Sequence, residues 1–476
     1  MLSRVRRVSR AVRRRRIGGR TAPPRRRDLR PVARRRRGGV GRGAAVERTG
    51  RRAPAGHRSP SGRHAAPRGP SRCGGGVTGD PRIDLPVARP ARTVCRVLRG
   101  AGHEAYVVGG AVRDALLGRP VAEWDVTTGA LPDEVMALFR RTIPTGVDHG
   151  TVTVVIGGTP IEVTTYRGEG TYSDARRPDE VHFGVPLRED LARRDFTINA
   201  IAYDPDSGRL VDPFDGRGDL ERRVLRAVGD PRERFREDGL RVMRAVRFVA
   251  ALGFDVDPAT EAAIPGALPS LRKVSAERVR VELFKLLAAP HAARGLAVAE
   301  RTGVLDAILP ERSEPIAVVD ALPPDAPLRF AALIAGADAR TAGRVARRLR
   351  LSNEDRRRVE RAIEHGRAAY GPGWTDADVR RFVARAGRAH AMDAALVARA
   401  VHGAADLPDR VRAVLDRGEP VAVGDLAITG ADVMRILGVP PGPEVGRALD
   451  RLLDAVLEDP SQNTPDALAA RLAAGE

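Results

Sequence analysis

The stretch that decides the fold of this chain is Val107–Thr128, which reads VVGGAVRDALLGRPVAEWDVTT. An apolar segment enters a Gly109-Gly110 turn and a short helix, and Glu123 and Asp125 then follow on an extended segment. Because side chains alternate along a strand, these two carboxylates share one face. Paired acids beside a glycine turn suit divalent-metal chemistry on phosphates, and a solvated strand end is the alternative interpretation.

The acidic pair, Glu123 and Asp125, is the predicted metal site. Mg²⁺ prefers oxygen ligands and keeps several waters, so two carboxylates can serve it while a hydroxyl attacks an α-phosphate. Glu162, in the strand-like segment IEVTTYR, is a candidate third catalytic acid. The alternative is that Glu162 is only a surface acid on a neighbouring strand.

Two further groups are predicted to contact the triphosphate. Gly109 and Gly110 permit close approach of the backbone, and Arg113 is placed to hold the terminal phosphate. Arg194 and Asp195, in EDLARRDFTINAIAYD, stand directly before a predicted strand and suit contacts to phosphate or sugar. Asp195 can equally orient an arginine or cap the next element.

A fourth group lies in FREDGLRVMRAVRF, Phe235–Phe248, which is predicted to form one helix. Asp238 and Arg241 are neighbours at i and i+3, and Arg244 and Arg247 continue the same spacing. One interpretation is an ion-paired, solvated face. The other is base recognition: Asp238 accepts from the amino group of cytosine or adenine while Arg241 donates to the ring nitrogen. Uracil and guanine present a carbonyl there and are rejected.

Charge is concentrated at the N-terminus. Residues 1–79 hold 25 Arg and two acids, Asp28 and Glu47, so they carry +23 where the whole chain carries +21, and 80–476 nets −2. Such a segment, rich in Arg, Gly and Pro, is predicted to be a disordered extension. The alternatives are a nonspecific RNA-binding arm and a start codon assigned too far upstream. The near-neutral remainder disfavours a chromatin-like basic protein.

The chain shows no signal for a membrane or an oxidising compartment. Cys73 and Cys95 are too few for a disulfide framework or a thiolate metal site. No apolar run approaches the roughly 20 residues of a membrane span, and residues 1–79 lack the apolar core of a secretory signal. A cytoplasmic protein without membrane association is expected. Its oligomeric state stays open.

The chain as a whole is predicted to be α+β. Strand-like segments dominate from Ala105 to about Asp219 and include Ile198–Tyr203, which predicts a head with a mixed sheet. From about Leu220 the apolar spacing becomes three to four residues, which predicts a purely helical remainder.

Taken together, these motifs resemble those of the class II tRNA nucleotidyltransferases, the CCA-adding enzymes, of the polymerase β-like superfamily. HGTVTVV resembles a head strand, GTYSDARRPDEVHF the flexible loop and VSAERVRVELFKLL the helical neck. The resemblance spans about Val87–Leu472. It implies a nucleotidyltransferase head (80–219), a nucleotide-selecting neck (220–289), a helical body (290–415) and a tRNA-binding helical tail (416–476).

The resemblance also implies roles for single residues. Glu123 and Asp125 would bind Mg²⁺, and Asp238 and Arg241 would act as a protein template for the base. Arg244 and Arg247 would lie on the triphosphate or ribose side. Together with the positions inferred above, the predicted nucleotide contacts are Gly109, Gly110, Arg113, Arg194, Asp195, Asp238, Arg241, Arg244 and Arg247.

Two residues depart from the family pattern. Glu123 stands where the family usually has Asp, and the extra methylene moves the carboxylate by about 1 Å, a shift that can cost two orders of magnitude in rate. Gly239 lies inside the predicted template helix at a cost of roughly 1 kcal/mol relative to Ala. It is expected to ease the approach of a base.

The predicted function is addition of C, C and A to tRNA 3′ ends from CTP and ATP, without a nucleic-acid template. The 3′-hydroxyl attacks the α-phosphate with Mg²⁺ as cofactor, pyrophosphate leaves, and the partner is the tRNA acceptor arm. Close alternatives are A-adding, CC-adding and poly(A)-polymerase specificity. The resemblance associates a complete flexible loop, here 169–184, with CCA addition in place of CC addition, and leaves A addition open. An alternative of another class is a noncatalytic RNA-binding protein in which Glu123 marks a decayed metal site.

Overall fold

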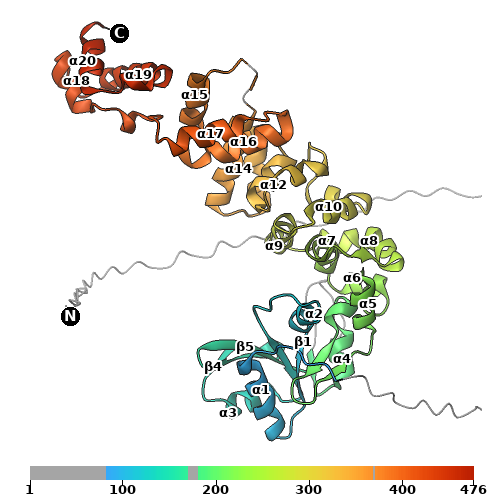
Figure 1. Cartoon of the computed structure of the whole chain (residues 1–476). Helices are drawn as coiled ribbons and strands as arrows, with labels where there is room; N and C mark the ends of the chain where they lie inside the picture. The colour runs from blue at the N-terminus through green and yellow to red at the C-terminus, as the bar shows by residue number, and fades with distance from the viewer. Residues whose placement is uncertain (1–81, 170–180, 368–369, 372, 476) are drawn as a thin grey trace, which may run out of the picture. The chain divides into compact units, whose positions relative to one another are not determined.

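The computed structural model describes residues 82–169, 181–367, 370–371 and 373–475 (Figure 1). The chain divides into two units, Met1–Gly76 and Val77–Glu476, and the described residues all belong to the second. The predicted extension 1–79 and residues 170–180 of the predicted flexible loop lie outside the described ranges.

The first part of the described chain is built on one mixed sheet of seven strands in the order β3-β4-β5-β2-β1-β8-β9. Strands β2 and β5 pair in parallel and the other neighbours are antiparallel. The mixed sheet predicted from the sequence is therefore confirmed. The elements are α1 (Arg89–Gly100), β1 (Ala105–Val108), α2 (Gly110–Leu116), β2 (Asp125–Thr128), α3 (Pro132–Leu138), β3 (Thr142–Gly146), η1 (Val147–His149), β4 (Thr151–Ile156), β5 (Thr159–Thr165), β6 (Arg167–Glu169), β7 (Val181–Phe183), α4 (Leu187–Ala192), η2 (Thr197–Asn199), β8 (Ala202–Asp204) and β9 (Arg209–Val211).

The two faces of this sheet have different neighbours. Val107 and Val126 are buried in the core that also holds the apolar side of α1. Val108 points the other way, into a second core with Leu191 of α4. Asp125 pairs with Val108 in the ladder between β1 and β2, so its carboxylate starts from the face opposite α1. This arrangement places the acid at a strand end where it is not covered by the main core.

The segment predicted as a strand over Ile198–Tyr203 folds differently. A short 3₁₀ turn covers Thr197–Asn199, and strand β8 begins only at Ala202. Two side-chain hydrogen bonds accompany this turn. Asn199 donates its side-chain amide to Asp195 at 2.9 Å, and Thr197 donates its hydroxyl to the buried Asp219 at 2.7 Å. Side chains that are occupied in this way hold the backbone in a turn.

The helical part begins with α5 (Gly216–Arg222), α6 (Pro231–Glu237), α7 (Leu240–Leu252), α8 (Pro258–Leu271) and α9 (Ala276–Leu287). The prediction of a purely helical remainder from about Leu220 is wrong here, because two short strands follow α5. Strands β10 (Val224–Leu225) and β11 (Asp255–Val256) form a parallel pair of two residues each. A pair this short has no periodicity that a sequence could show.

The prediction of one continuous helix over Phe235–Phe248 is wrong at its start. Helix α6 ends at Glu237, Asp238 is extended with φ −137° and ψ 107°, and α7 begins at Leu240. The Asp238 carboxylate accepts at 2.9 Å from the backbone N–H of Leu240, the first residue of α7.

Gly239 has a packing role that the sequence analysis did not predict. A Cβ at Gly239 would lie 2.4 Å from the carbonyl carbon of Ser270 and 2.6 Å from the backbone nitrogen of Leu271, at the end of α8. These neighbours are backbone atoms, so no side-chain rotation could make room for the added Cβ. The glycine therefore lets the α6–α7 junction meet α8. That it also eases the approach of a base stays a prediction.

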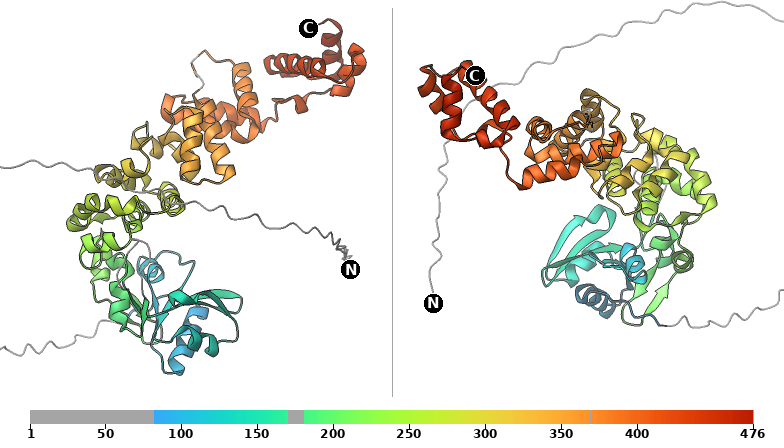
Figure 2. Two further views of the ribbon diagram at one scale, coloured as in Figure 1. Left: turned by 180° about the vertical axis from the view of Figure 1, so that it is seen from behind. Right: turned by 45° about the horizontal axis from the view of Figure 1, so that its top comes forward.

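The remaining described residues form helices and 3₁₀ turns, coloured from yellow to red in Figures 1 and 2. Helix α14 shows the predicted spacing, with Val359, Ala362, Ile363 and Gly366 buried. The elements are α10 (Ala292–Arg301), α11 (Val304–Ile308), η3 (Ile316–Ala321), α12 (Ala326–Leu333), α13 (Ala339–Arg348), α14 (Asn353–Gly366), α15 (Asp376–Ala386), α16 (Arg388–His402), α17 (Leu407–Asp416), η4 (Val423–Asp425), α18 (Gly430–Leu437), α19 (Pro443–Glu458), η5 (Pro460–Gln462) and α20 (Pro465–Ala473).

Separate cores stabilise the later helices. Val383 of α15 and Val411 of α17 belong to one apolar cluster, and Val433 of α18 and Leu468 of α20 belong to another. Within the described ranges, none of the helices combines the length and apolar character that crossing a bilayer requires.

Gly239→Ala is expected to lower the free energy of unfolding by about 1–3 kcal/mol, because the added methyl meets fixed backbone of Ser270. Urea denaturation followed by circular dichroism measures the change. Gly266→Ala is the matched control: a Cβ at Gly266, within α8, meets nothing within 4 Å. The control should be neutral or slightly stabilising. Equal stability of the two variants would contradict the packing role of Gly239.

Candidate active site

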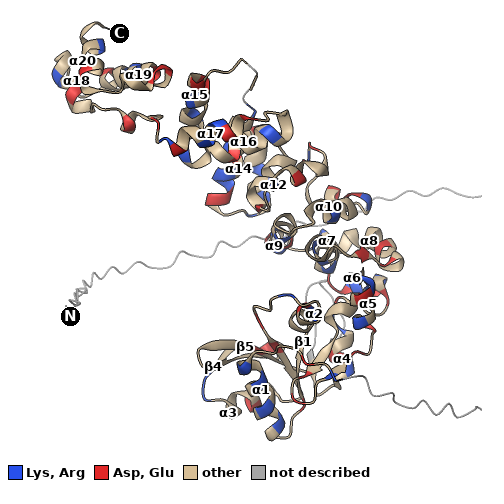
Figure 3. Cartoon of the chain, viewed as in Figure 1, with Lys and Arg blue, Asp and Glu red and all other residues tan. Residues whose placement is uncertain are grey.

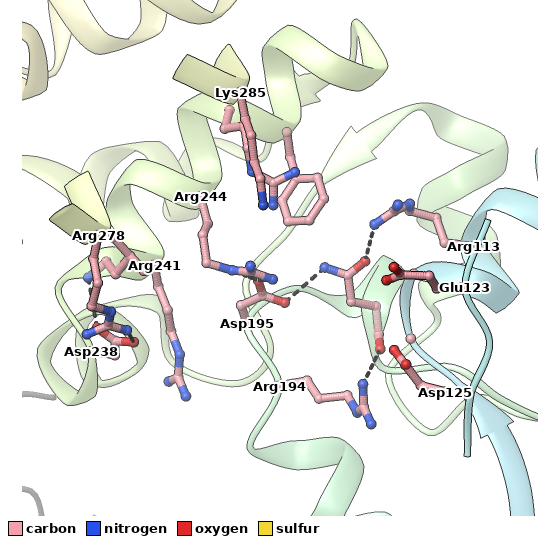
Figure 4. A pocket seen from close by; sticks show the side chains of 16 residues that line it. Arg113, Glu123, Asp125, Arg194, Asp195, Asp238, Arg241, Arg244, Arg278 and Lys285 are labelled. Atoms are coloured by element: carbon pink, nitrogen blue, oxygen red, sulfur yellow. Dashed lines mark hydrogen bonds and ion pairs between the residues drawn. The ribbon is translucent and has the colours of Figure 1, made fainter. Parts of the chain in front are cut away.

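A cavity of about 650 Å³ lies between the β1–α2 turn and β2 on one side and helices α7 and α9 on the other (Figure 4). Its wall combines a glycine turn, four acids and seven basic side chains. It is lined by Gly109, Gly110, Arg113, Glu123, Asp125, Arg194, Asp195, Asn199, Asp238, Leu240, Arg241, Arg244, Arg247, Phe248, Arg278 and Lys285.

The cavity brings together all the predicted site residues except Glu162. Glu162 pairs with Asp125 in the parallel β2–β5 ladder, so the two lie side by side, but Glu162 is exposed outside the cavity. In the described part of the chain, no three or more His, Cys, Asp and Glu side chains gather closely enough to hold a metal ion. The cavity therefore offers a pair of acids.

The charges around Asp125 fit a cation. Desolvation raises the pKa of Asp125 above its ordinary value, the nearby Glu162 and Glu123 carboxylates raise it further, and Arg194 opposes them. Like charges held this close are relieved by a positive ion between them. Mg²⁺ is commonly bound through one or two carboxylates together with substrate phosphates. Glu123 and Asp125 supply that donor set, and Glu123 precedes strand β2, whose first residue is Asp125.

The glycine turn is shaped by Arg194. Gly109 has φ 78°, which favours glycine, and a Cβ there would lie 2.9 Å from Nη1 of Arg194. Gly110 then starts α2, and Arg113 on that helix pairs with Asp114 at 2.8 Å. The turn therefore carries the backbone past a guanidinium that faces the cavity.

A hydrogen-bonded chain connects the sheet to the helices across the cavity. Arg113 donates to Oδ1 of Asn199 at 2.7 Å, and Nδ2 of Asn199 donates to Oδ1 of Asp195 at 2.9 Å. Arg244 of α7 completes the chain with a 2.6 Å bond to Oδ2 of Asp195 (Figure 4). Burial disfavours the charged form of Asp195, but the bonds to Arg244 and Asn199 outweigh burial and hold its pKa below the ordinary value.

Three arginines of the cavity wall pack around the ring of Phe248. The guanidinium carbons of Arg247, Arg113 and Arg244 lie 3.7, 5.0 and 5.3 Å from its ring centroid. A ring face stabilises cations that approach within about 6 Å. Arg247 is further held by Glu282 of α9 at 2.5 Å. These contacts fix several positive charges in one wall without neutralising all of them.

Asp238 and Arg241 both face the cavity, but they do not pair with each other. Arg278 of α9 donates to Oδ2 of Asp238 at 2.8 Å. Arg241 is held by the Glu237 carboxylate and donates to the backbone oxygen of Arg193 at 3.0 Å. Both side chains are therefore ion-paired, each with a partner of its own, and Arg241 is buried and not solvated.

The sequence analysis did not select five residues of the wall: Asn199, Leu240, Phe248, Arg278 and Lys285. Asn199 lies four positions after Asp195 of the selected Arg-Arg-Asp motif, and Arg278 and Lys285 lie in the segment that resembles the neck. The sequence motifs could therefore have pointed to these three residues. Leu240 and Phe248 follow the apolar spacing of α7 and could not be separated from ordinary core positions.

Comparison with known proteins covers most of the described chain. Residues 105–226 match the family model described as "Poly A polymerase head domain". Residues 253–314 match "Probable RNA and SrmB- binding site of polymerase A". Residues 328–472 match tRNA nucleotidyltransferase domain 2.

Whole-length relatives agree with these models. The CCA-adding enzyme of Geobacillus stearothermophilus is 40% identical over 396 residues, which cover 81% of this chain and 97% of the relative. That of Limosilactobacillus fermentum is 38% identical over 399 residues, 81% of this chain and 96% of the relative.

Solved structures agree as well. The Bacillus stearothermophilus CCA-adding enzyme in complex with CTP superposes with a TM-score of 0.69 at 36% identity, covering 81% of this chain and 97% of that one. A Thermotoga maritima CCA-adding enzyme complexed with tRNA, 21% identical with a TM-score of 0.62 over 83% of this chain and 97% of that one, shares the fold. The predicted fold class and CCA-adding activity are confirmed, and the chain belongs to the CCA-adding enzymes, the class II tRNA nucleotidyltransferases.

Proposed function

We propose that this cavity binds CTP and ATP and that Glu123 and Asp125 hold Mg²⁺ for transfer of the nucleotide to a tRNA 3′ end. The observation that carries the proposal is one cavity in which a carboxylate pair faces six arginines and a lysine. A nucleoside triphosphate with its cation has the complementary charge pattern. The relative solved with CTP, at 36% identity, supports this choice of ligand.

The carboxylate pair has a defined task in this proposal. Bound there, Mg²⁺ would neutralise negative charge that develops on the α-phosphate and on the departing pyrophosphate. Asp125 is fixed by the β1–β2 ladder, and Glu123 approaches from the segment before it. Glu162 lies beside Asp125 in the β2–β5 ladder but does not line the cavity, and its negative charge raises the pKa of the Asp125 carboxylate. The prediction of Glu162 as a third catalytic acid is kept as part of the proposal.

The phosphates are proposed to lie along the basic wall. Arg113, Arg244 and Arg247 are held around Phe248, and Lys285 reaches the cavity from α9 (Figure 4). Side chains held in advance lose little conformational freedom when the ligand binds. Gly109 and Gly110 leave room for the triphosphate beside Arg194.

The base is proposed to lie between Asp238 and Arg241. Arg278 steadies the Asp238 carboxylate and Glu237 steadies Arg241, so the acceptor and the donor have fixed positions. Fixed groups discriminate well because a wrong base leaves them unpaired. Cytosine and adenine present the amino donor and ring acceptor that this pair needs, and uracil and guanine do not.

The helices beyond the cavity are proposed to hold the tRNA acceptor arm through its backbone. Figure 3 marks Lys and Arg positions along α14–α17, interleaved with Asp and Glu positions. The relative solved with tRNA shares this fold. The predicted boundaries of head, neck, body and tail and the predicted cytoplasmic location are kept as parts of the proposal.

Asp125→Asn is expected to reduce CTP incorporation by roughly 10²–10³-fold, because one charged metal ligand is lost. Glu123→Gln should reduce CTP incorporation by a similar factor. Glu123→Asp keeps the charge and should retain at least about a tenth of the rate of CTP incorporation. Radiolabelled CTP incorporation into tRNA, with Mg²⁺ and then Mn²⁺, measures these effects. Asp133→Asn, an exposed acid on α3, is the control. Full activity of Asp125→Asn would rule out the proposed metal pair.

Asp238→Ala is expected to reduce the preference for CTP over UTP by about 1–3 kcal/mol, or roughly 5- to 150-fold, because the acceptor for the amino group is lost. Single-nucleotide incorporation with each triphosphate measures the ratio of kcat/KM values. Glu233→Gln, exposed on the neighbouring α6, should leave that ratio unchanged. An unchanged ratio in Asp238→Ala would place base selection elsewhere.

The full reaction is expected to proceed by addition of C to tRNA ending in −N and −NC and of A to tRNA ending in −NCC. Primer extension with each nucleoside triphosphate alone separates the specificities. Loss of the A step would indicate a CC-adding enzyme, loss of both C steps an A-adding enzyme, and long adenylate products a poly(A) polymerase. CTP that is never incorporated would contradict the assignment.

A further inference from the structure

Asp190 of helix α4 is a fully buried carboxylate outside the cavity, with 0% of its surface exposed. Its Oδ1 accepts from Nε of Arg193 at 2.9 Å and lies 2.8 Å from Nη2 of the same side chain. Its Oδ2 accepts from the hydroxyl of Thr127 at 3.1 Å. Thr127 is on β2, two residues after Asp125, so Asp190 is fixed to the strand that carries the metal carboxylate.

Arg194 lies between Asp190 and Asp125. Its Nη2 is 3.7 Å from Oδ2 of Asp190, and its Nη1 is 3.5 Å from the backbone oxygen of Asn199. Its Nε is buried without a hydrogen-bond acceptor among the described residues. Both Arg194 and Asp125 line the cavity, where Figure 4 shows them as neighbours, but these two described residues form no ion pair within 4.0 Å.

Two carboxylates therefore compete for one guanidinium. Arg194 forms its ion pair with Asp190. It also interacts electrostatically with the nearby Asp125 carboxylate. If the charge of Asp190 were removed, Asp195 and Asp125 would be the carboxylates left to attract Arg194 on the cavity side, and Asp195 is already bonded to Arg244 and Asn199. A bidentate Arg–carboxylate pair would occupy the oxygens that a divalent cation needs.

We propose that Asp190 is a positioning residue that retains Arg194 and so keeps the Asp125 carboxylate free for the divalent cation. This inference rests on the proposed metal role of Asp125. Asp190 touches neither the cavity nor the nucleotide, and it acts only through Arg194. Arg194 then stays available to the phosphates while its positive charge remains close to the acids.

The chain supplies a matched control in Asp219. It is also 0% exposed, accepts from the Thr197 hydroxyl at 2.7 Å, and pairs with Arg222 at 2.9 Å and Arg226 at 3.2 Å. It does not line the cavity. Asp219→Asn therefore removes an equally buried, arginine-paired charge whose side-chain partners in the described chain are Thr197, Arg222 and Arg226, and neither Arg194 nor Asp125.

The test is a titration of the full chain with Mn²⁺ alone, followed by electron paramagnetic resonance of the free ion. Asp190→Asn is expected to weaken Mn²⁺ binding about tenfold, a change of about 1.4 kcal/mol. Arg194→Gln should bind Mn²⁺ at least as tightly as the unaltered chain. The double variant Asp190→Asn/Arg194→Gln should return to within about twofold of Arg194→Gln, since the competitor is gone. Asp219→Asn should leave the binding constant unchanged.

The outcomes separate the inference from its basis. If Asp125→Asn does not weaken Mn²⁺ binding, the proposed metal site is wrong, and the role of Asp190 is wrong with it. If Asp125 is required but Asp190→Asn binds Mn²⁺ normally, or the double variant is not restored, Asp190 is only a structural residue.

A second variant guards against loss of folding, because removing one partner of a buried ion pair is strongly destabilising. Asp190→Glu keeps the negative charge. Its side chain is longer by one methylene group, which is expected to shift Arg194 toward the cavity. It is expected to weaken Mn²⁺ binding about two- to fivefold, and the weakening should vanish in the Arg194→Gln background. Equal weakening in both backgrounds would overturn the proposal.

Discussion

The contact between Asp195 and Arg244 is the interaction on which the active site depends. Asp195 follows helix α4 and Arg244 lies on α7, so the 2.6 Å bond joins the sheet side of the cavity to its helical side. Asn199 extends the same bond to Arg113. Asp195 is buried, and a buried carboxylate is tolerated only when its charge and hydrogen bonds are satisfied. Loss of Arg244 would therefore disturb both halves of the cavity together.

Four charged side chains of the cavity wall are each held by an oppositely charged side chain that does the supporting. Glu282 holds Arg247, Glu237 holds Arg241, Arg278 holds Asp238, and Asp190 retains Arg194. A cavity that must accept a highly charged triphosphate needs many cations close together, and without such partners they would repel one another. The supporting residues come from α4, α6 and α9, which are distant in sequence. The site is thus a property of how these helices pack.

Most of the fold and much of the site could be predicted because the signals are local. The strand–turn–helix pattern of Val107–Thr128 needs only a few residues to be recognised, and the paired acids follow from alternation along a strand. The break at Asp238 and Gly239 could not be predicted from helical spacing. It depends on the backbone of Ser270, 31 residues further on, which leaves no room for a Cβ.

The amino-acid sequence by itself determined which chemistry the chain carries: the acidic pair, the glycine turn, the arginine series and the family to which they belong. Only the tertiary structure decided which of these groups meet. It excluded Glu162 from the cavity although that residue neighbours Asp125 in the sheet, and it added Asn199, Arg278 and Lys285. It also separated Asp238 from Arg241 and gave each its own partner. The physical reason is that spacing along a chain fixes which face a side chain starts from, whereas pairing requires a second element, and that element is brought close only by folding.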